Sequence, residues 1–532
     1  MQIAVVADVH LHDLYGGYGM LKESSGEVAL RTLADTMAST RVFNESHVAF
    51  IAVLDDIVRR GIRDVVLLGD YSDDGQMDAV AALKKVLSLY ENSRGMRFFV
   101  TFGNHDCFGP EPRHQAKWLT KANGHDPLLV TSDERANTPA VIKAGMLGMS
   151  TDHAMKSMAY YGVGRPEGVA HWETPFVNCD GQEHQRRHHS DGTCLDASYL
   201  IEPQDGLWLL MLDANVFHRV NGTWQVRSDA AWDHILEERP YILTWISDVA
   251  ERAIRTGKTL LAFSHYPALP LALTGEGETV RCPCTPDWHE RMPSLKSSQR
   301  LAEAGLRWHF SGHMHVAGRT ELNGLINLAV PSPVAYPGGY IIVTIENGVV
   351  YPDTVHLKET KGFDIGFSAY ENQIVDFNNP ISTPLLACST YSEFLRLHLL
   401  HLVATKHCPN DWPPNLIIYL DQPISHLFIG YAELSSVMEK WSSVVSQPFR
   451  IMMEDYYILR AGGELALQDI PRDRSDFYLD LGRALEACGQ VESDPVSHVF
   501  LERFFACFDG TFELRKMIVQ SDLCHRLSRS WP

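Results

Sequence analysis

The sequence predicts an α/β sandwich followed by a mainly helical C-terminal domain. Over roughly the first 350 residues, short apolar runs of strand character alternate with stretches of helical periodicity. Five polar clusters each follow one of these runs, and from about residue 390 the pattern becomes helical throughout. Strands that alternate with helices form βαβ units, so an α/β fold is the predicted class.

The elements of the sandwich follow one another along the chain. Apolar, β-branched runs predict strands at 2–7, 65–68, 97–101, 208–212, 259–263 and 307–310. Apolar residues at helical spacing predict helices at 45–60, 76–91 and 241–255. Two more strand-like runs, 340–345 and 349–355, flank Asn347-Gly348, a dipeptide that favours a hairpin turn.

The domain organisation follows from changes in this pattern. The sandwich is predicted to span 1–356, with a long looped insertion near the site at 107–200 that is rich in Gly, Pro, His and Asp. A connector at 357–390 leads to a helical domain at 391–532. There an apolar stripe predicts a core helix face, with an interface role left open for some of its members: Phe500, Leu501, Phe504, Phe505 and Phe508.

Composition restricts the partners. The 532 residues include 46 basic and 66 acidic side chains, a net charge of −20, which argues against a duplex nucleic acid as partner. The apolar run that starts at Ile3 reaches a charge at Asp8, and no stretch of about 18 apolar residues occurs, so neither a signal peptide nor a membrane span is expected. The ten cysteines are scattered, and a cytoplasmic protein is predicted. A homo-oligomer formed through the C-terminal domain stays open.

Five polar clusters carry the chemistry of the sequence. They are Asp8-Val9-His10, Gly69-Asp70, Gly103-Asn104-His105-Asp106, Ser264-His265 and Gly312-His313-Met314-His315. Each follows a predicted strand, and α/β sheets bind their ligands beyond the carboxyl ends of the strands. We therefore expect the clusters to meet at one rim.

The residue types in these clusters suit divalent transition metals. Carboxylate oxygens, an amide oxygen and imidazole nitrogens are their usual donors, and the absence of cysteine argues against a closed thiolate zinc site. Asp8 and His10 are two residues apart, as are His313 and His315, so each pair is expected to point to one side of a strand. Seven candidate ligands suit two cations better than one, and the lone carboxylate Asp70 could bridge them.

The set and order of these clusters resembles the signature of the calcineurin-like metallophosphoesterase superfamily over residues 1 to about 355. The resemblance implies a four-layer α/β/β/α sandwich. More loosely, residues 196–215 and the helix before His265 resemble bacterial cyclic-nucleotide phosphodiesterase-like members.

The resemblance also implies roles for single residues. The first metal would be held by Asp8, His10 and His315, the second by Asn104, His265 and His313, with Asp70 between them. His105 would lie beside the substrate phosphate and give its proton to the leaving group, and Asp106 would orient His105.

The activity implied is hydrolysis of a small phosphodiester, with a cyclic nucleotide among the candidates, by a hydroxide that bridges two Mn, Fe or Zn ions. Two alternatives remain: a phosphomonoesterase (a protein phosphatase or nucleotidase), and a metal-free binding scaffold on the same fold.

Two smaller features complete the expectations. Asp73 and Asp74 are expected to shape a turn. A second, structural zinc site built from Cys179, Cys194, Cys282 and Cys284 is an open alternative to free thiols.

Overall fold

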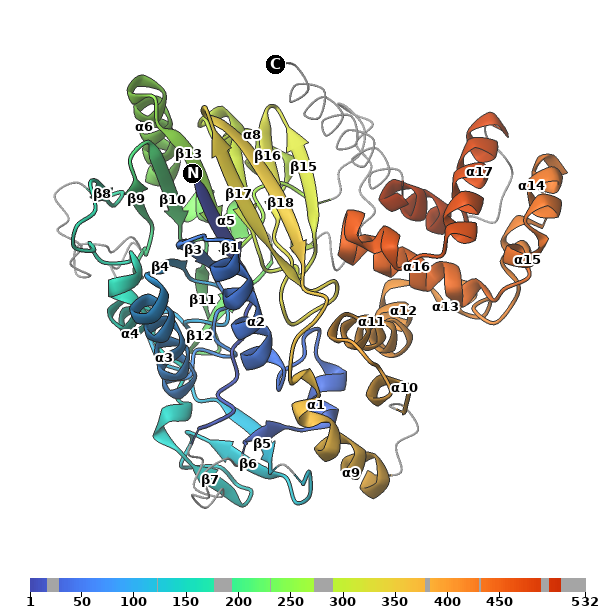
Figure 1. Cartoon of the computed structure of the whole chain (residues 1–532), viewed down its shortest axis with the longest axis horizontal. Coiled ribbons are helices and arrows are strands. Elements are labelled where there is room, and N and C mark those ends of the chain that lie inside the picture. Colours follow the sequence, from blue (N-terminus) through green and yellow to red (C-terminus); the bar gives the residue numbers. More distant parts are fainter. Residues whose placement is uncertain are drawn as a thin grey trace. The chain divides into compact units, whose positions relative to one another are not determined.

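The computed structural model describes residues 1–16, 28–121, 123–176, 194–229, 231–271, 290–377, 383–429, 432–488 and 497–508 (Figure 1). The chain divides into two compact units. The first comprises Met1–Pro270, Glu290–His315 and Arg319–His398, and the second consists mainly of the residues from Leu399 onward. All of the clusters identified above belong to the first unit.

One sheet of the first unit has five strands in the order β18-β17-β1-β3-β4. The strands are β1 (Gln2–Val6), β3 (Asp64–Leu68), β4 (Arg97–Thr101), β17 (Gly339–Glu346) and β18 (Val349–His356). β1, β3 and β4 are parallel, and β17 runs antiparallel to β1. The predicted hairpin turn is confirmed, because Asn347 and Gly348 join β17 to β18 with φ values of 52° and 78°.

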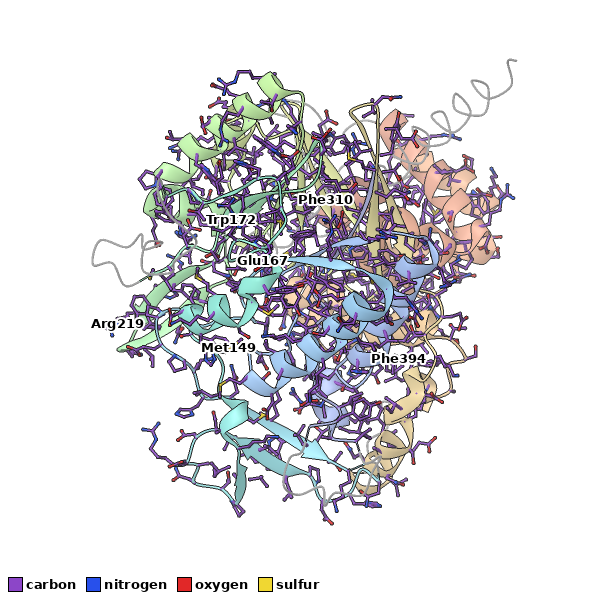
Figure 2. The ribbon with its side chains drawn as sticks, turned by 60° about the vertical axis from the view of Figure 1, so that its left-hand side comes forward. Met149, Glu167, Trp172, Arg219, Phe310 and Phe394 are labelled. Atoms are coloured by element: carbon purple, nitrogen blue, oxygen red, sulfur yellow. The ribbon has the colours of Figure 1, made fainter. Side chains whose placement is uncertain are left out.

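The second sheet has seven strands in the order β15-β16-β14-β13-β10-β9-β8. The strands are β8 (Trp172–Glu173), β9 (Tyr199–Gln204), β10 (Leu207–Leu212), β13 (Thr259–Ser264), β14 (Trp308–Ser311), β15 (Gly318–Leu322) and β16 (Leu325–Ala329). β10, β13, β14 and β16 are parallel, so their carboxyl ends lie at one edge. Phe310 of β14 lies in the interior and stacks on Phe263 of β13, with ring centroids 5.1 Å apart (Figure 2).

Helices cover the outer faces of the two sheets, and the predicted four-layer α/β/β/α sandwich is confirmed (Figure 1). α2 (Ser46–Arg59) and α3 (Met77–Arg94) lie on the outer side of the five-stranded sheet. α5 (Ala231–Glu238), α6 (Tyr241–Thr256) and α8 (Leu295–Glu303) bury their apolar faces against the seven-stranded sheet. The sheets meet where the hydroxyl of Tyr199 on β9 donates to the carbonyl of Val100 on β4, at 2.9 Å.

The insertion at 107–200 was expected to be looped, and that expectation was wrong. It contains β5 (Ala116–Thr120), β6 (Leu128–Thr131) and β7 (Ala140–Ile142), which form a four-stranded sheet with β2 (Leu30–Arg31). It also contains α4 (Thr151–Met158) and the strand β8. The strands were missed because they are short and mix buried with exposed apolar residues, such as Trp118 at 45% exposure, so no clear period appears in the sequence.

A hairpin of β11 (Val216–Val220) and β12 (Thr223–Arg227) projects from the first unit, with Arg219 towards its outer end (Figure 2). The predicted connector at 357–390 contains α9 (Phe367–Phe377) and α10 (Thr383–Leu386).

The second unit is helical in its described part, as predicted. After α11 (Tyr391–Leu402) its longer helices are α16 (Phe449–Gly462) and α17 (Arg472–Cys488). The stripe that begins at Phe500 lies on a further helical stretch at 497–508 and is buried, which confirms it as a core face. No helix in the described part of the chain combines the length and apolar character needed to cross a membrane.

Candidate metal centre

All seven candidate ligands lie just beyond the carboxyl ends of strands. Asp8 and His10 follow β1, Asp70 follows β3, and Asn104 follows β4 in the five-stranded sheet. In the other sheet His265 follows β13, and His313 and His315 follow β14. The structure brings all seven together, and six of them fall into two groups of three.

The first group consists of Asp8, His10 and His315. The Nε2 atoms of the two histidines are 3.1 Å apart. Oδ1 of Asp8 is 4.0 Å from Nε2 of His10 and 3.4 Å from Nε2 of His315. One carboxylate oxygen and two ring nitrogens thus point at a common centre.

The second group consists of Asn104, His265 and His313. The amide oxygen of Asn104 lies 3.2 Å from Nε2 of His265 and 3.0 Å from Nδ1 of His313. The other ring nitrogens face backbone carbonyls: Nδ1 of His265 is 3.1 Å from the carbonyl of Leu68, and Nε2 of His313 is 3.2 Å from that of Ser228. A carbonyl on one ring nitrogen leaves the lone pair of the other free for a metal.

Asp70 lies between the two groups. Its Oδ2 is 3.7 Å from Nε2 of His10 and 3.3 Å from Nε2 of His265. Oδ1 of Asp70 accepts a hydrogen bond from the backbone N–H of His105 at 2.8 Å, which holds the carboxylate in place. This is the position that a bridging ligand requires.

The donor set fits two divalent cations. Carboxylate oxygens, an amide oxygen and imidazole nitrogens converge, and they repel one another unless positive charge lies between them. The ring nitrogens that converge here are Nε2 of His10 and Nε2 of His315, while the Nδ1 atoms of both rings are buried with no hydrogen-bond partner among the described residues.

The backbone at these positions is unusual for residues other than glycine. Asp8, His10, Asp70, His313 and His315 have φ values of 53°, 44°, 48°, 68° and 53°, in the sparsely populated left-handed region. Such strain persists only where surrounding contacts impose it, and it gathers at functional sites. We expected each i, i+2 pair to point to one side of a strand. Asp8 and His10 do point at one centre, whereas His313 and His315 belong to different groups, because these residues lie past the strand ends.

Glycines in the clusters make room for the ligands. A Cβ atom on Gly103 would lie 2.1 Å from Oδ1 of Asp70, and one on Gly312 would lie 2.5 Å from Oδ2 of Asp8. Only glycine therefore lets the neighbouring backbone approach these carboxylates so closely.

His105 lies at the margin of the centre, with its ring centroid 5.0 Å from that of His10. Asp106 was expected to orient it, but both oxygens of Asp106 accept other hydrogen bonds, from Ser72 and from the backbone N–H of Gly103. Instead, Nδ1 of His105 is 2.8 Å from Oδ1 of Asp74. Asp106 thus supports the loops behind the centre, and Asp74 orients His105.

Charges within the centre shift the acidities of its members. Burial and Arg41 lower the pKa of His105, but Asp70 and Asp74 outweigh them and the net shift is upward. Burial would likewise lower the pKa of His265, yet Asp70 and Asp8 raise it to about 9. Burial alone would raise the pKa of Asp70, whereas His265, His105 and His10 bring it well below its ordinary value. The nearby carboxylates therefore favour the protonated forms of His105 and His265, and the histidines favour the ionised form of Asp70.

Three charged side chains around His105 were not selected from the sequence as site residues: Asp74 and Arg41 contact His105, and Lys117 contacts Asp74. Asp74 was assigned to a turn, while Arg41 and Lys117 lie outside every cluster. Arg41 precedes α2, and Lys117 lies on β5 of the insertion. No local pattern distinguishes them from surface charges, and only the fold brings them here.

Cys179, Cys282 and Cys284 lie outside the described residues, and Cys194 is buried.

Residues 1–154 match the family model described as Calcineurin-like phosphoesterase. This segment contains Asp8, His10, Asp70, Asn104 and His105. His265, His313 and His315 lie beyond the match and join the same centre through the fold.

Several solved structures are similar to this chain at low identity. A dimetal phosphatase from Danio rerio is 13% identical with a TM-score of 0.35, covering 67% of this chain and 98% of that one. A putative 5'-nucleotidase from Staphylococcus aureus is 10% identical with a TM-score of 0.31, covering 70% and 58%. A phosphopantetheinyl hydrolase from Mycobacterium tuberculosis is 12% identical with a TM-score of 0.24, covering 62% and 90%. No curated protein sequence matches the chain.

Proposed function

We propose that this chain is a phosphoesterase that works with two metal ions. The observation that carries the proposal is the convergence of carboxylate, amide and imidazole donors from five separate segments, with Oδ2 of Asp70 within 3.7 Å of one group and 3.3 Å of the other. The family match over residues 1–154 supports it.

In this proposal Asp8, His10 and His315 hold one cation, and Asn104, His265 and His313 hold the other, with Asp70 shared between them. Two cations bound in this way supply a water acidic enough to attack near neutral pH and positive charge for the phosphate oxygens. The protein holds the donors rigidly, since the backbone N–H of His313 donates to both oxygens of Asp8 at 3.1 Å.

His105 is the candidate general acid. Asp74 accepts from Nδ1 of His105 and so leaves Nε2 to face the substrate. The raised pKa of His105 favours its imidazolium form, which can donate a proton to the departing oxygen. The ring is 27% exposed, so a substrate can reach it.

Two substrate classes are candidates. The looser sequence resemblance favours a small phosphodiester, a cyclic nucleotide among them. One structural observation favours a phosphomonoester, as for a protein phosphatase or nucleotidase: the Arg41 guanidinium lies 3.4 Å from Nδ1 of His105, beside the expected phosphate position. A metal-free scaffold is the rival from another class, and it is not expected to keep every donor of both groups.

Metal analysis and one substitution test this proposal. Purified protein should contain about two transition-metal ions per chain, and Asp70→Asn should lose metal and esterase activity together, because Asp70 is the donor shared by both sites. Gln373→Asn, at a buried amide that donates nothing to the centre, serves as the control for handling and folding. Protein that binds no Mn, Fe or Zn, or an Asp70→Asn variant with unchanged turnover, would contradict the proposal.

A further inference from the structure

Three cations from separate segments converge on one buried carboxylate beside His105. Nη1 of Arg31 is 3.1 Å from Oδ2 of Asp73, Nη2 of Arg41 is 3.2 Å from Oδ1, and the ammonium of Lys117 binds Oδ2. The Asp73 side chain is fully buried, and the Arg31 and Arg41 side chains are each only 11% exposed. Placing so much charge in a low-dielectric interior is costly, and such an arrangement is typical of functional sites.

The Arg41 guanidinium has an N–H donor that no acceptor in the described part of the chain uses. Its Nη2 donates to the carbonyl and to Oδ1 of Asp73, both at 3.2 Å. Its Nε is buried and has no acceptor among the described residues. A guanidinium carries five N–H donors in a planar fork that matches the oxygens of a phosphate.

The Arg41 guanidinium lies beside His105. Nη2 lies 3.4 Å from Nδ1 of His105, the side chain that faces the substrate in the proposed reaction. The loop carrying Arg41 is held in place, because the backbone N–H of the next residue, Val42, donates to the carbonyl of Val334 at 2.9 Å. Arg41 therefore reaches the margin of the metal centre from a rigid support.

We propose that Arg41 determines specificity by holding an anionic oxygen of a phosphomonoester, so that monoesters are the preferred substrates. This inference rests on the proposed function. A phosphomonoester has three non-bridging oxygens and close to two negative charges at neutral pH, whereas a diester has two such oxygens and one charge. Two cations can accept two oxygens, and only a monoester has a third that needs a further donor. A bidentate guanidinium beside His105 supplies that donor.

Arg31 is a matched control within the same cluster. It binds the same carboxylate, is equally buried, and stacks on the same ring, Phe43, at 4.2 Å against 5.3 Å for Arg41. Its Nε, however, donates to Asp35 at 3.1 Å, and no contact with His105 occurs among the described residues. Removing Arg31 disturbs the Asp73 cluster without removing the donor that faces the substrate.

The experiment compares Arg41→Gln, Arg41→Lys and Arg31→Gln in metal-loaded protein. It measures kcat/KM for p-nitrophenyl phosphate and bis-p-nitrophenyl phosphate, and the affinity for inorganic phosphate by calorimetry. Arg41→Gln should lower monoester kcat/KM by about 10–100-fold and weaken phosphate binding by about tenfold or more, with a change of about threefold or less for the diester. Arg41→Lys, which keeps the charge but not the fork, should fall between wild type and Arg41→Gln. Arg31→Gln should leave the ratio of the two activities unchanged.

The outcomes separate this inference from the function on which it rests. Metal-loaded wild type that hydrolyses neither ester overturns the proposed function. An active wild type whose Arg41 variants lose both esters equally, or bind phosphate as tightly as wild type does, overturns the role of Arg41. If Arg41→Gln does not fold, Arg41→Lys decides by the same two measurements.

Discussion

At the scale of single residues, the relation between His105 and Asp74 decides how the proton is delivered. His105→Ala should keep both metals yet lower turnover by about 10²–10⁴-fold, because a positioned acid is lost while the metal ligands remain. Asp74→Asn should lower turnover less, by about 10–100-fold, since it removes only the group that orients the ring. Turnover and metal content of each variant check this. Wild-type rates in His105→Ala would refute its role as the acid.

A buried carboxyl group with a raised pKa, that of Glu45, lies away from the centre. Glu45, just before α2, is fully buried, and neither carboxyl oxygen has a hydrogen-bond partner among the described residues. Burial raises the pKa of Glu45 from 4.5 to about 8. The folded protein therefore holds a proton there that the unfolded chain releases at lower pH.

This shift predicts a pH-dependent effect on stability. Between pH 4.5 and about 8 the folded state binds more protons at Glu45 than the unfolded state, so the free energy of unfolding falls as pH rises. Glu45→Gln removes this penalty, and it should stabilise the protein by about 1–4 kcal/mol at pH 8.5 and have little effect at pH 4.5. Thermal unfolding at both pH values measures it. Glu91→Gln, at a less buried acid on α3, is the control, and an equal gain at both pH values would contradict the prediction.

At the scale of elements, a buried arginine ties the carboxyl end of β10 to the helices that cover it. Arg239, directly after α5, is 1% exposed and donates to the carbonyls of Asp213 and Asn215, both at 2.6 Å. It also lies 3.8 Å from the carboxylates of Asp196 and Asp213. These carboxylates belong to the stretch 196–215 that suggested a phosphodiesterase. Their contacts are internal, so we expect this stretch to support packing rather than to select a substrate.

Arg239→Met should accordingly destabilise the protein without changing substrate preference. Loss of the guanidinium leaves two buried carboxylates uncompensated, which costs about 3–5 kcal/mol. Arg252→Met removes the partly exposed pair with Glu173 and should cost about 1 kcal/mol or less. Thermal unfolding and the ratio of monoester to diester activity measure both effects. A changed ratio in Arg239→Met would show that this region does reach the substrate.

At the scale of the whole molecule, the metal centre links the two sheets of the sandwich. Asp8 and Asp70 follow strands of one sheet, and His265 and His313 follow strands of the other. Bound cations should therefore stabilise the fold by a binding linkage worth about 4 kcal/mol at a thousandfold excess over Kd. Chelation should lower the Tm, and added Mn²⁺ should restore it. Asp70→Asn should respond to neither treatment, and an unchanged wild-type Tm after chelation would refute the linkage.

The sequence by itself determined the α/β sandwich, the strands that end in polar clusters, and the ligand types of the centre. These features are local: an apolar run predicts a strand, and the glycines and polar residues at its end predict where the chain turns. The tertiary structure alone decided that Asp74 rather than Asp106 orients His105. It also decided that β2, whose Leu30 pairs with Thr120 of β5, joins the sheet of the insertion. Only the fold brings Arg41 and Lys117 to the surroundings of His105. Arg41 and His105 are 64 residues apart, and Lys117 and Asp73 are 44 apart. Such contacts depend on which buried charges the fold brings together, and no short-range pattern in the sequence records them.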